Sequence, residues 1–592
     1  MIKSKIQFMG NRPMISIDGE LRSPVAYTTY FDECGEWSDF INSGHRIFFV
    51  NISFTDLPIN NTTGFTPFRT GVFEGDMPDY SEFESTVHKI LSECPDALIF
   101  PRINIAMPRW WINSHPDETV STPSGARESL FSDLFLRDGE RLLREMLKHF
   151  RSSDYSHRIA GYQLCGGTTQ EWFHHDLFGS YSKMGMDKFR KWASEKHGVE
   201  NIKAPEKGDF DSGINTEAVT LYYEFCNELI SRTVEHFARV TKGFTEGSQV
   251  VGVFYGYNGF VSDPLWGTHG LRYIINSPYI DFFSSPCAYD DTRNLGLDWG
   301  DMLPVDSIKH HGKLCFIECD IRTHLTRRMQ ESRPNEYPDD IMSLTLPDGR
   351  KSVWCGPDTL ELSLSAIRKA FAHQVTKGSG IWWFDMWGGW YHSDVIMSEL
   401  QALHKTYETL GDTPSSAEVV FFIDESAYSS IPRGNHLLSA VNNVRVALGN
   451  TGIPFDTYMV EDAPEILSSY KYAIFSAPFP SMAGKEALAL CKKLGIPHIE
   501  ATEETAYYST NKLRQILIDA GIHCYNSQSN VIYCGNGILA IHTAHDGETI
   551  IHLPRKMKIA PLHGTDILTQ ETDTIKLTMP KHSTAIFSIT DI

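Results

Sequence analysis

Basic residues are in short supply in this chain of 592 residues, which has 53 Lys and Arg against 74 Asp and Glu and a net charge of −21. That balance would repel a nucleic acid or an anionic membrane, so we expect neither as a partner. Long apolar runs are missing too, because none reaches the roughly 18 residues that a membrane span requires. The opening segment MIKSKIQFMGNRPM lacks the apolar core of a secretory signal.

Cysteine is sparse and irregularly spaced. The 11 cysteines are an odd number, and no C-x-x-C pair occurs, so we expect neither a disulfide framework nor a structural zinc site. Walker A, H-E-x-x-H, G-x-S-x-G and G-x-G-x-x-G motifs are also absent, and no motif requires a cofactor or a metal. These absences favour a cytoplasmic protein with reduced thiols.

The chain does contain a recurring alternation of a short apolar run, a polar and aromatic loop, and a helical pattern. Amphipathic stripes at Leu142–Phe150, Cys226–Phe237 and Leu364–Val375 have the spacing of helices that cover a sheet. Eight runs lack the polar alternation of half-exposed strands and are typical of buried parallel strands: Pro24–Tyr30, Arg46–Phe54, Ala97–Ala106, Ile159–Leu164, Val250–Tyr257, Ile280–Ser285, Leu314–Ile317 and Gly380–Phe384. Eight strands alternating with helices predict a (β/α)8 TIM barrel.

Two smaller units are expected after the segment GDTPSS at residues 411–416. Strands at 419–423, 455–460, 472–476 and 498–500, with helices between them, predict a flavodoxin-like α/β domain. From about residue 526 only strand patterns remain, which predicts a small C-terminal antiparallel β-sandwich. The predicted division is therefore 1–412 for the barrel, 413–524 for the α/β domain and 525–592 for the β domain.

Polar and aromatic residues follow the strands of the predicted barrel, where such barrels bind ligands. Glu171 follows the fourth run, and Glu318 ends the seventh. The other candidates, expected to bind substrate, are Arg102, Asn104, Trp172, His174, Tyr257, Tyr289, Trp383 and Trp387. Because side chains alternate along a strand, only one of Trp382 and Trp383 can point inward, and we assign Trp382 to the core.

Two carboxyl groups in a mouth rich in indole rings suit the cleavage of a glycosidic bond, which needs a proton donor and a carboxylate at the anomeric carbon. Glu171, beside Trp172 and neutral residues, fits the acid/base, and Glu318, with Arg322 nearby, fits the nucleophile. Tyr289 is expected to donate a hydrogen bond to Glu318.

Four of the remaining candidates are expected to contact the sugar directly. Arg102 and Asn104 are expected to hold sugar hydroxyls, and Trp383 and Trp387 to stack on the apolar face of a ring.

Each glutamate also has a structural interpretation, since a glutamate after a strand is often a solvated loop acid or a charge at a helix start. Asp290, Asp291 and Asp385 are alternative carboxylates. His174 and His175 suit polar loop positions or substrate contacts better than metal ligation.

The barrel, with its acid/base after strand four and its nucleophile at strand seven, resembles the clan A glycoside hydrolases. The order of barrel, flavodoxin-like domain and small β domain resembles the family 42 β-galactosidases and a related family of β-mannosidases. In that family an Asn that contacts the sugar 2-hydroxyl usually precedes the acid/base, and Gln170 stands at that position here. The resemblance implies a homotrimer assembled through the second domain.

These observations lead to a retaining, exo-acting β-glycosidase that acts on short oligosaccharides, with a β-galactoside as the first expectation and a β-mannoside as the alternative. A catalytically silent carbohydrate-binding protein, and a lyase or transferase on the same barrel, remain rival hypotheses.

Overall fold

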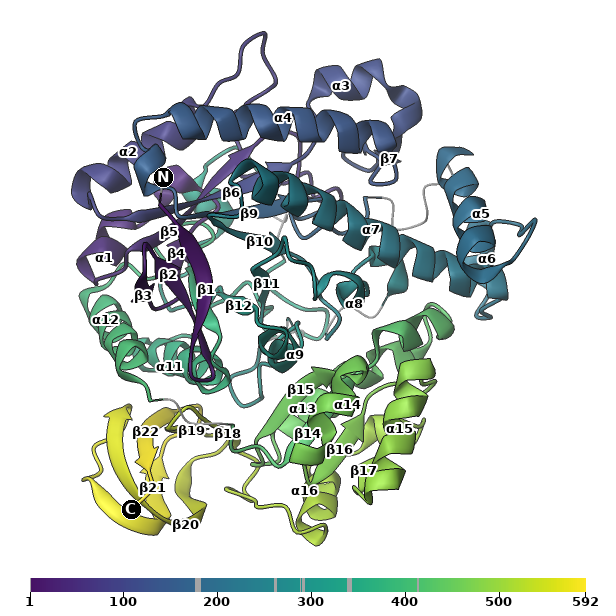
Figure 1. Cartoon of the computed structure of the whole chain (residues 1–592). Helices are drawn as coiled ribbons and strands as arrows, with labels where there is room; N and C mark the ends of the chain where they lie inside the picture. The colour runs from purple at the N-terminus through teal and green to yellow at the C-terminus, as the bar shows by residue number, and fades with distance from the viewer. Residues whose placement is uncertain are drawn as a thin grey trace.

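The structure, a computed structural model, describes residues 2–175, 183–259, 263–287, 289, 293–337, 343–411 and 415–592. Its centre is a closed parallel barrel (Figure 1). The strands are β4 (Val25–Thr28), β5 (Ile47–Ser53), β6 (Leu98–Ile105), β9 (Gly161–Gly166), β10 (Val250–Phe254), β11 (Phe282–Pro286), β12 (Leu314–Cys319) and β13 (Gly380–Phe384). Each overlaps one predicted run in the predicted order, so the TIM-barrel prediction is confirmed.

The barrel interior is filled by large side chains that alternate with outward-facing ones. Phe49, Phe100, Phe282, Phe316 and Trp382 belong to one buried cluster inside the barrel. The ring centroids of Phe49 lie 4.9 Å from Phe100 and 5.5 Å from Phe316. This aromatic layer closes the interior, so any ligand must bind above it, at the carboxyl ends of the strands.

Amphipathic helices cover the outside of the barrel, as the sequence stripes predict. The longest are α4 (Asp133–Ser152), α7 (Glu217–Phe244) and α11 (Leu360–Lys377), and each begins after a Ser or Thr whose side chain accepts a backbone N–H. Shorter elements complete this layer and its loops: α1 (Trp37–Asn42), α2 (Ser81–Glu93), α3 (Arg109–Ser114), β7 (Thr119–Thr122), β8 (Gly125–Glu128), α5 (Lys183–His197), α6 (Lys207–Phe210), α8 (Leu271–Ile274), α9 (Val305–His310), α10 (Met329–Ser332) and α12 (Asp394–Thr409). No helix of the described ranges is both long and apolar enough to cross a membrane.

An antiparallel sheet at the N-terminus was not predicted. It consists of β1 (Ser4–Met9), β2 (Arg12–Ile17) and β3 (Glu20–Arg22). Ser4 contacts the backbone of Ala160 and Val250 at the amino ends of two barrel strands, and Ile15 and Ile17 join the interior cluster. The sheet therefore covers the end of the barrel opposite the ligand-binding end.

The α/β unit has a four-stranded parallel sheet in the order β15–β14–β16–β17, with β14 at Val419–Ile423, β15 at Phe455–Met459, β16 at Tyr472–Phe475 and β17 at His498–Ile499. One apolar cluster joins the sheet to α13 (Ala440–Gly449) and α16 (Thr510–Asp519), and another joins its other face to α14 (Ala463–Ile466) and α15 (Met482–Leu494). Helices on both faces of a parallel sheet confirm the doubly wound, flavodoxin-like prediction.

The C-terminal strands form one antiparallel sheet in the order β18–β19–β22–β20–β21. Their bounds are β18 Val531–Gly535, β19 Ile538–His542, β20 Gly547–His563, β21 Gln570–Met579 and β22 Thr584–Thr590. Leu539, Ile541 and Phe587 build the sheet's own core, whereas Ile538, Ala540 and Ile586 pack into the cluster of the barrel helices. The β unit is thus attached to the barrel through an apolar face. The predicted boundary between residues 412 and 413 lies outside the described residues.

The three units meet at a buried ionic junction. Asp298, from a barrel loop, accepts hydrogen bonds from Tyr533 of the β unit (2.7 Å) and from Arg445 of the α/β unit (3.1 Å). Asp298 and Arg445 are both buried. A Cβ on Gly449 would lie 2.3 Å from the Asp298 carboxylate, so only glycine allows this approach.

Asp298→Ala should lower the apparent Tm strongly, because it leaves the Arg445 guanidinium buried without its carboxylate, at a cost of about 3–5 kcal/mol. Asp591→Ala, which breaks an ion pair between Asp591 and Arg555 in which both side chains are more than 60% exposed, is the control and should cost only about 0–1 kcal/mol. Equal thermal shifts in calorimetry would show that the junction does not stabilise the molecule.

Candidate active site

Glu171 lies on a tight loop directly after β9, where it forms a bridge with Gly166. Thr169, Gln170 and Trp172 have φ angles of 60°, 72° and 59°, in the left-handed region that non-glycine residues rarely adopt. Each such residue costs about 1–3 kcal/mol, and strain of this kind persists where the surroundings enforce it, commonly at functional sites. The strained loop therefore identifies Glu171 as a candidate functional residue on structural grounds, separately from its position in the sequence.

Two hydroxyl groups hold the Glu171 carboxyl. Tyr257 donates to Oε1 at 2.9 Å, and Thr169 donates to Oε2. Burial raises the pKa of Glu171 to about 7, against the opposing effect of these hydroxyls and of Arg102. A carboxyl with this pKa can both release and accept a proton near neutrality.

Glu318 points into the barrel from the carboxyl end of β12. In the strand register it lies beside Pro286 of β11 and Trp382 of β13. Burial and the nearby negative charge of Asp320 raise the pKa of Glu318 well above its usual range, and Arg102 opposes this shift. Its Oε2 atom is buried and, among the residues described, has no hydrogen-bond partner. That oxygen is therefore available to a ligand.

The two glutamates act on the same neighbours, which places them at one site. The negative charges of both Glu171 and Glu318 raise the pKa of Tyr257 beyond the effect of burial, and both charges also raise the pKa of Cys165, whose burial is the larger cause. Both charges also raise the pKa of the Tyr30 hydroxyl, for which burial is the largest cause. Both residues stand at the carboxyl ends of barrel strands, β9 and β12, and their assignment as a catalytic pair stays a prediction.

Arg102 lies at the floor of the site, fully buried within an aromatic cage. Its guanidinium carbon is 4.8 Å from the ring centroid of Trp382, 4.9 Å from Phe254 and 5.4 Å from Tyr30. In the described part of the chain none of its three side-chain nitrogens has a hydrogen-bond partner. A buried guanidinium with free N–H groups is costly unless a ligand or a nearby carboxylate compensates it.

Asn104 and Gln170 add further unsatisfied polar atoms. Asn104 donates to Ser53 at 3.0 Å, but its Oδ1 atom is left without a partner within the described ranges. The same holds for both polar atoms of the fully buried Gln170 side chain. Arg102, Asn104 and Gln170 thus present both donors and acceptors, which suits a ligand with many hydroxyl groups.

The predicted hydrogen bond from Tyr289 to Glu318 is wrong. Tyr289 donates its hydroxyl to Asp320 rather than to Glu318, and Arg322 pairs with Asp320 at 2.5 Å. Arg293 pairs with the other oxygen of Asp320. The sequence reasoning missed Asp320, although a residue two positions after Glu318 on a strand faces the same side.

Trp172, predicted to bind substrate, and Trp383, predicted to stack on a sugar, lie on the outer side of the barrel wall, so those two predictions are wrong. Trp172 is fully buried, stacks on Phe237 of α7 with centroids 5.8 Å apart, and donates to the carbonyl of Leu164. Trp383 belongs to the outer cluster and packs on Tyr391. Trp382 is the one that points inward, as strand alternation requires.

The remaining candidates have mixed outcomes. Trp387 packs against Tyr30, whose hydroxyl is influenced by both glutamates, so a role at the site stays a prediction. The His174 ring is buried and stacks on Phe131. Asp385 is buried and accepts the backbone N–H of Trp390, and burial raises its pKa to about 8. Asp290 and Asp291 lie outside the described residues.

A buried polar network supports the Glu171 loop from behind. His175 contacts Thr168 at 3.2 Å, Asn61 at 2.9 Å and Glu128 at 3.2 Å. Glu128 also pairs with Arg127, and despite its burial the Arg127 charge and the hydrogen bond with His175 lower its pKa to about 2. His175 therefore acts as a structural support for the loop and not as a metal ligand.

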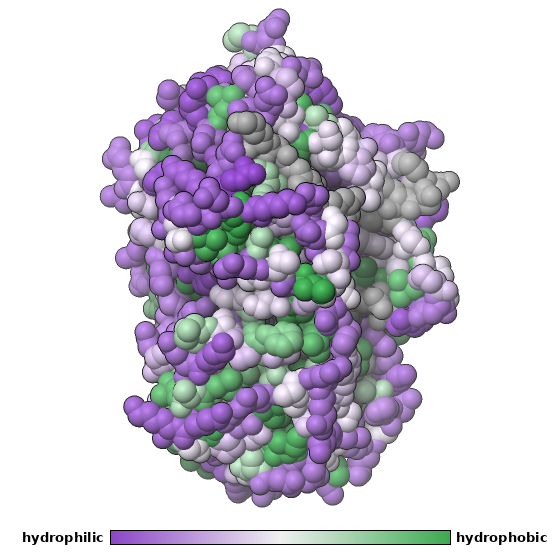
Figure 2. All heavy atoms as spheres, turned by 90° about the vertical axis from the view of Figure 1, so that its right-hand side faces the viewer, coloured by the Kyte–Doolittle hydropathy of each residue, from purple (hydrophilic) through white to green (hydrophobic). Residues whose placement is uncertain are grey.

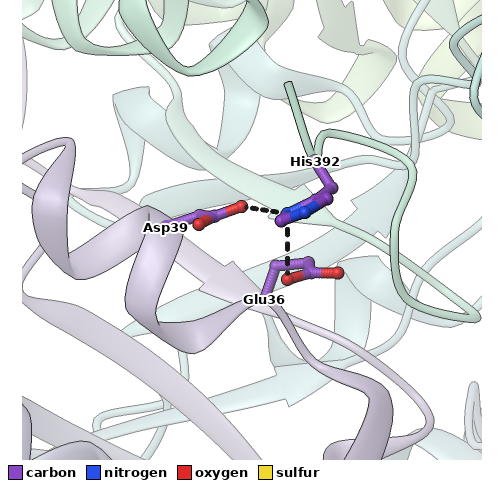
Figure 3. A group of neighbouring side chains, drawn as sticks. All are labelled: Glu36, Asp39 and His392. Atoms are coloured by element: carbon purple, nitrogen blue, oxygen red, sulfur yellow. Dashed lines mark hydrogen bonds and ion pairs between the residues drawn. The ribbon is translucent and has the colours of Figure 1, made fainter. Parts of the chain in front are cut away.

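A group of metal-type ligands occurs at the same end of the barrel among the described residues: Glu36, Asp39 and His392 (Figure 3). The Nδ1 atom of His392 faces both carboxylates, 2.7 Å from Asp39 and 3.4 Å from Glu36. The hydrogen bond to Asp39 is the largest cause that raises the pKa of His392. We interpret the group as an ion-paired histidine that ties the loop after β13 to α1.

Several solved structures share this fold. No protein-family model and no curated protein matches the sequence. The β-galactosidase from Rahnella sp. R3 aligns over 98% of this chain and 99% of its own, with a TM-score of 0.61 and 10% identity. The β-galactosidase from Bacillus circulans sp. alkalophilus aligns over 96% of this chain and 99% of its own, with a TM-score of 0.59 and 12% identity. The GH42 exo-carrageenase from Bacteroides ovatus aligns over 100% of this chain and 85% of its own, with a TM-score of 0.61 and 11% identity. The chain thus shares the fold of these solved structures.

Tyr257→Phe should raise the pKa of Glu171 above about 7, because the lost hydroxyl stabilises the ionised carboxylate. Titration of 13C-labelled glutamate carboxyls by NMR, with Glu171→Gln to assign the signal, measures the shift. Tyr255→Phe is the matched control, since Tyr255 donates to the carbonyl of Gly267 instead. A Glu171 pKa that is unchanged, or that moves equally in both variants, would contradict this account.

Proposed function

We propose that the chain is a retaining, exo-acting β-glycosidase that releases terminal sugars from short oligosaccharides. The observation that carries the proposal is the pair of carboxyls at the carboxyl end of the barrel around Arg102, the half-buried Glu171 and the buried Glu318, both with raised pKa values. The fold plan shared with GH42 β-galactosidases supports it. In one of these enzymes, from G. stearothermophilus, a glutamate-to-alanine variant is described as a catalytic mutant.

In the proposed mechanism, Glu318 attacks the anomeric carbon while Glu171 gives its proton to the glycosidic oxygen, so the aglycone leaves as an alcohol. Glu171, now ionised, removes a proton from water, and the resulting hydroxide displaces Glu318 to release the sugar with its original configuration. Two raised pKa values are compatible with these roles because a close pair of carboxyls shares one proton at intermediate pH. Arg102 favours the ionised form of Glu318.

A β-galactoside is the proposed substrate and a β-mannoside the alternative. The unsatisfied atoms of Arg102, Asn104 and Gln170 are the proposed contacts to sugar hydroxyls. A sulfated galactan is a further candidate, because the exo-carrageenase shares the fold over the whole chain. The silent carbohydrate-binding protein is disfavoured by the retention of both carboxyls and of the strained loop that presents one of them.

We also propose a cytoplasmic homotrimer with unit boundaries at 412/413 and 524/525. The α/β unit is the proposed interface, because it exposes several large apolar side chains, and Figure 2 shows apolar patches on the face of the molecule that it views. They are Phe479, Met482, Leu494, Tyr507 and Ile518, with exposures from 40% to 71%.

Glu318→Ala should reduce turnover of an aryl β-glycoside by several orders of magnitude, and added azide should then yield the α-glycosyl azide. Glu171→Ala should reduce turnover of poor leaving groups by about 10²–10⁴-fold but spare good ones, because only poor leaving groups need the proton. Glu571→Ala, on the exposed face of β21, is the control. If both site variants keep near-normal kcat/KM, the assignment of the carboxyls is wrong.

The kcat/KM of the enzyme should fall as the pH rises through about 7, because Glu171 must be protonated to assist departure of the leaving group. A pH series with 4-nitrophenyl β-D-galactoside measures this limb, and a panel of nitrophenyl glycosides should show the β-galactoside to be the best substrate. Preference for the β-mannoside would replace the sugar assignment, while a basic limb far from pH 7 would reject Glu171 as the acid.

A further inference from the structure

A second concave site lies beside the carboxyl pair. This pocket, which we call the cationic pocket, has a volume of about 320 Å³ and is formed by the segments that follow β11 and β12, by α11 and by His582 of the β unit. Four of its lining residues carry a fixed positive charge: Arg293, Arg322, Arg350 and Lys351. A concentration of cations is unusual in a chain with a net charge of −21.

The charge balance of the pocket favours an anion. Asp320 pairs with Arg293 and Arg322, Asp348 pairs with Arg350, and Asp358 pairs with Lys351. Among the described residues that line the pocket, four are cations and one, Asp358, is a carboxylate. Trp299 contributes to the wall, and behind it the buried Lys369 ammonium lies 3.7 Å from the ring centroid. This additional cation increases the positive potential.

The cationic pocket shares a wall with the candidate active site. Arg322 lines the pocket, and its Nη1 atom also binds Asp320, two residues after Glu318. The Tyr289 ring lies between the two arginines, with guanidinium carbons 4.3 Å (Arg293) and 5.6 Å (Arg322) from its centroid. Arg322 is 5% exposed, and its buried Nε atom has no hydrogen-bond partner within the described residues. A buried donor of this kind points to a missing ligand.

From this arrangement we propose that the cationic pocket binds an anionic substituent, either a sulfate ester or a carboxylate, on a sugar adjacent to the one that is cleaved. This inference rests on the proposed glycosidase function and narrows its substrate class to acidic glycans. Arg322 gives the pocket a fixed, buried donor next to Glu318, Arg293 adds a buried positive charge, and Arg350 and Lys351 add charge at the outer side of the pocket. Guanidinium groups suit the planar or tetrahedral oxygens of both substituents.

Calorimetric titration with three probes tests the proposal: D-galactose 6-sulfate, D-galacturonate and neutral D-galactose. The wild-type protein should bind one or both anionic sugars more tightly than galactose. Comparison of the two anionic sugars shows whether sulfate or carboxylate is preferred. The double variant Arg350→Gln/Lys351→Gln should weaken binding of the preferred anion about ten-fold, the effect of losing charge-assisted hydrogen bonds worth about 1.4 kcal/mol. Higher salt should weaken it further.

The chain offers a matched control in Arg555→Gln/Lys556→Gln. These two neighbouring residues pair with Asp591 and Glu571 and are 64% and 63% exposed, close to the 53% and 60% of Arg350 and Lys351. The control should bind all three probes like the wild type. Both pairs are at the surface, so neither double variant should prevent folding, and calorimetric melting confirms that.

The proposal is overturned if galactose binds as tightly as both anionic sugars, or if the Arg350/Lys351 variant and the control lose affinity equally. Binding is measured without turnover, so this result is independent of the hydrolysis of 4-nitrophenyl β-D-galactoside by the wild type. A failure of hydrolysis with anion binding intact would reject the glycosidase, not the pocket.

Discussion

The burial of charge at the mouth of the barrel is the constraint on which the rest of this structure depends. Arg102, Glu318 and Asp320 are buried and Glu171 is half-buried, above an aromatic layer that fills the barrel interior. Ions in such surroundings are stable only with opposite charges at close range. Arg293 and Arg322 compensate Asp320, which leaves Arg102 to the two glutamates. One Arg102 guanidinium does not fully neutralise two glutamates, so their pKa values stay raised. The proposed chemistry depends on these raised pKa values.

The scaffold holds these groups by several independent means. The Glu171 loop is strained and is supported by the buried network around His175, so its carboxyl is positioned before any ligand arrives. The N-terminal sheet covers the far end of the barrel, and the ionic junction at Asp298 joins the three units. Rigid support of this kind reduces the reorganisation needed during a reaction.

Much of the architecture was predictable because strand and helix periodicities are local. Each of the eight barrel strands overlaps an apolar run, and the stripes at Leu142–Phe150 and Leu364–Val375 became α4 and α11. The N-terminal sheet was missed because β1 carries a mixed polar pattern, and its contact with Val250 is remote in sequence. At the site, Tyr289 donates to Asp320 and not to Glu318 as expected, and the pairing of Glu171 with Glu318 stays a prediction.

The sequence by itself determined the order of strands and helices, and hence which residues lie at the carboxyl ends of the barrel strands. Only the tertiary structure decided that Asp320 takes both arginines, that Trp172 and Trp383 turn outward, and that four cations gather beside Glu318. The physical reason is that ion pairing and ring packing depend on distances across loops far apart in the chain, which no local pattern encodes.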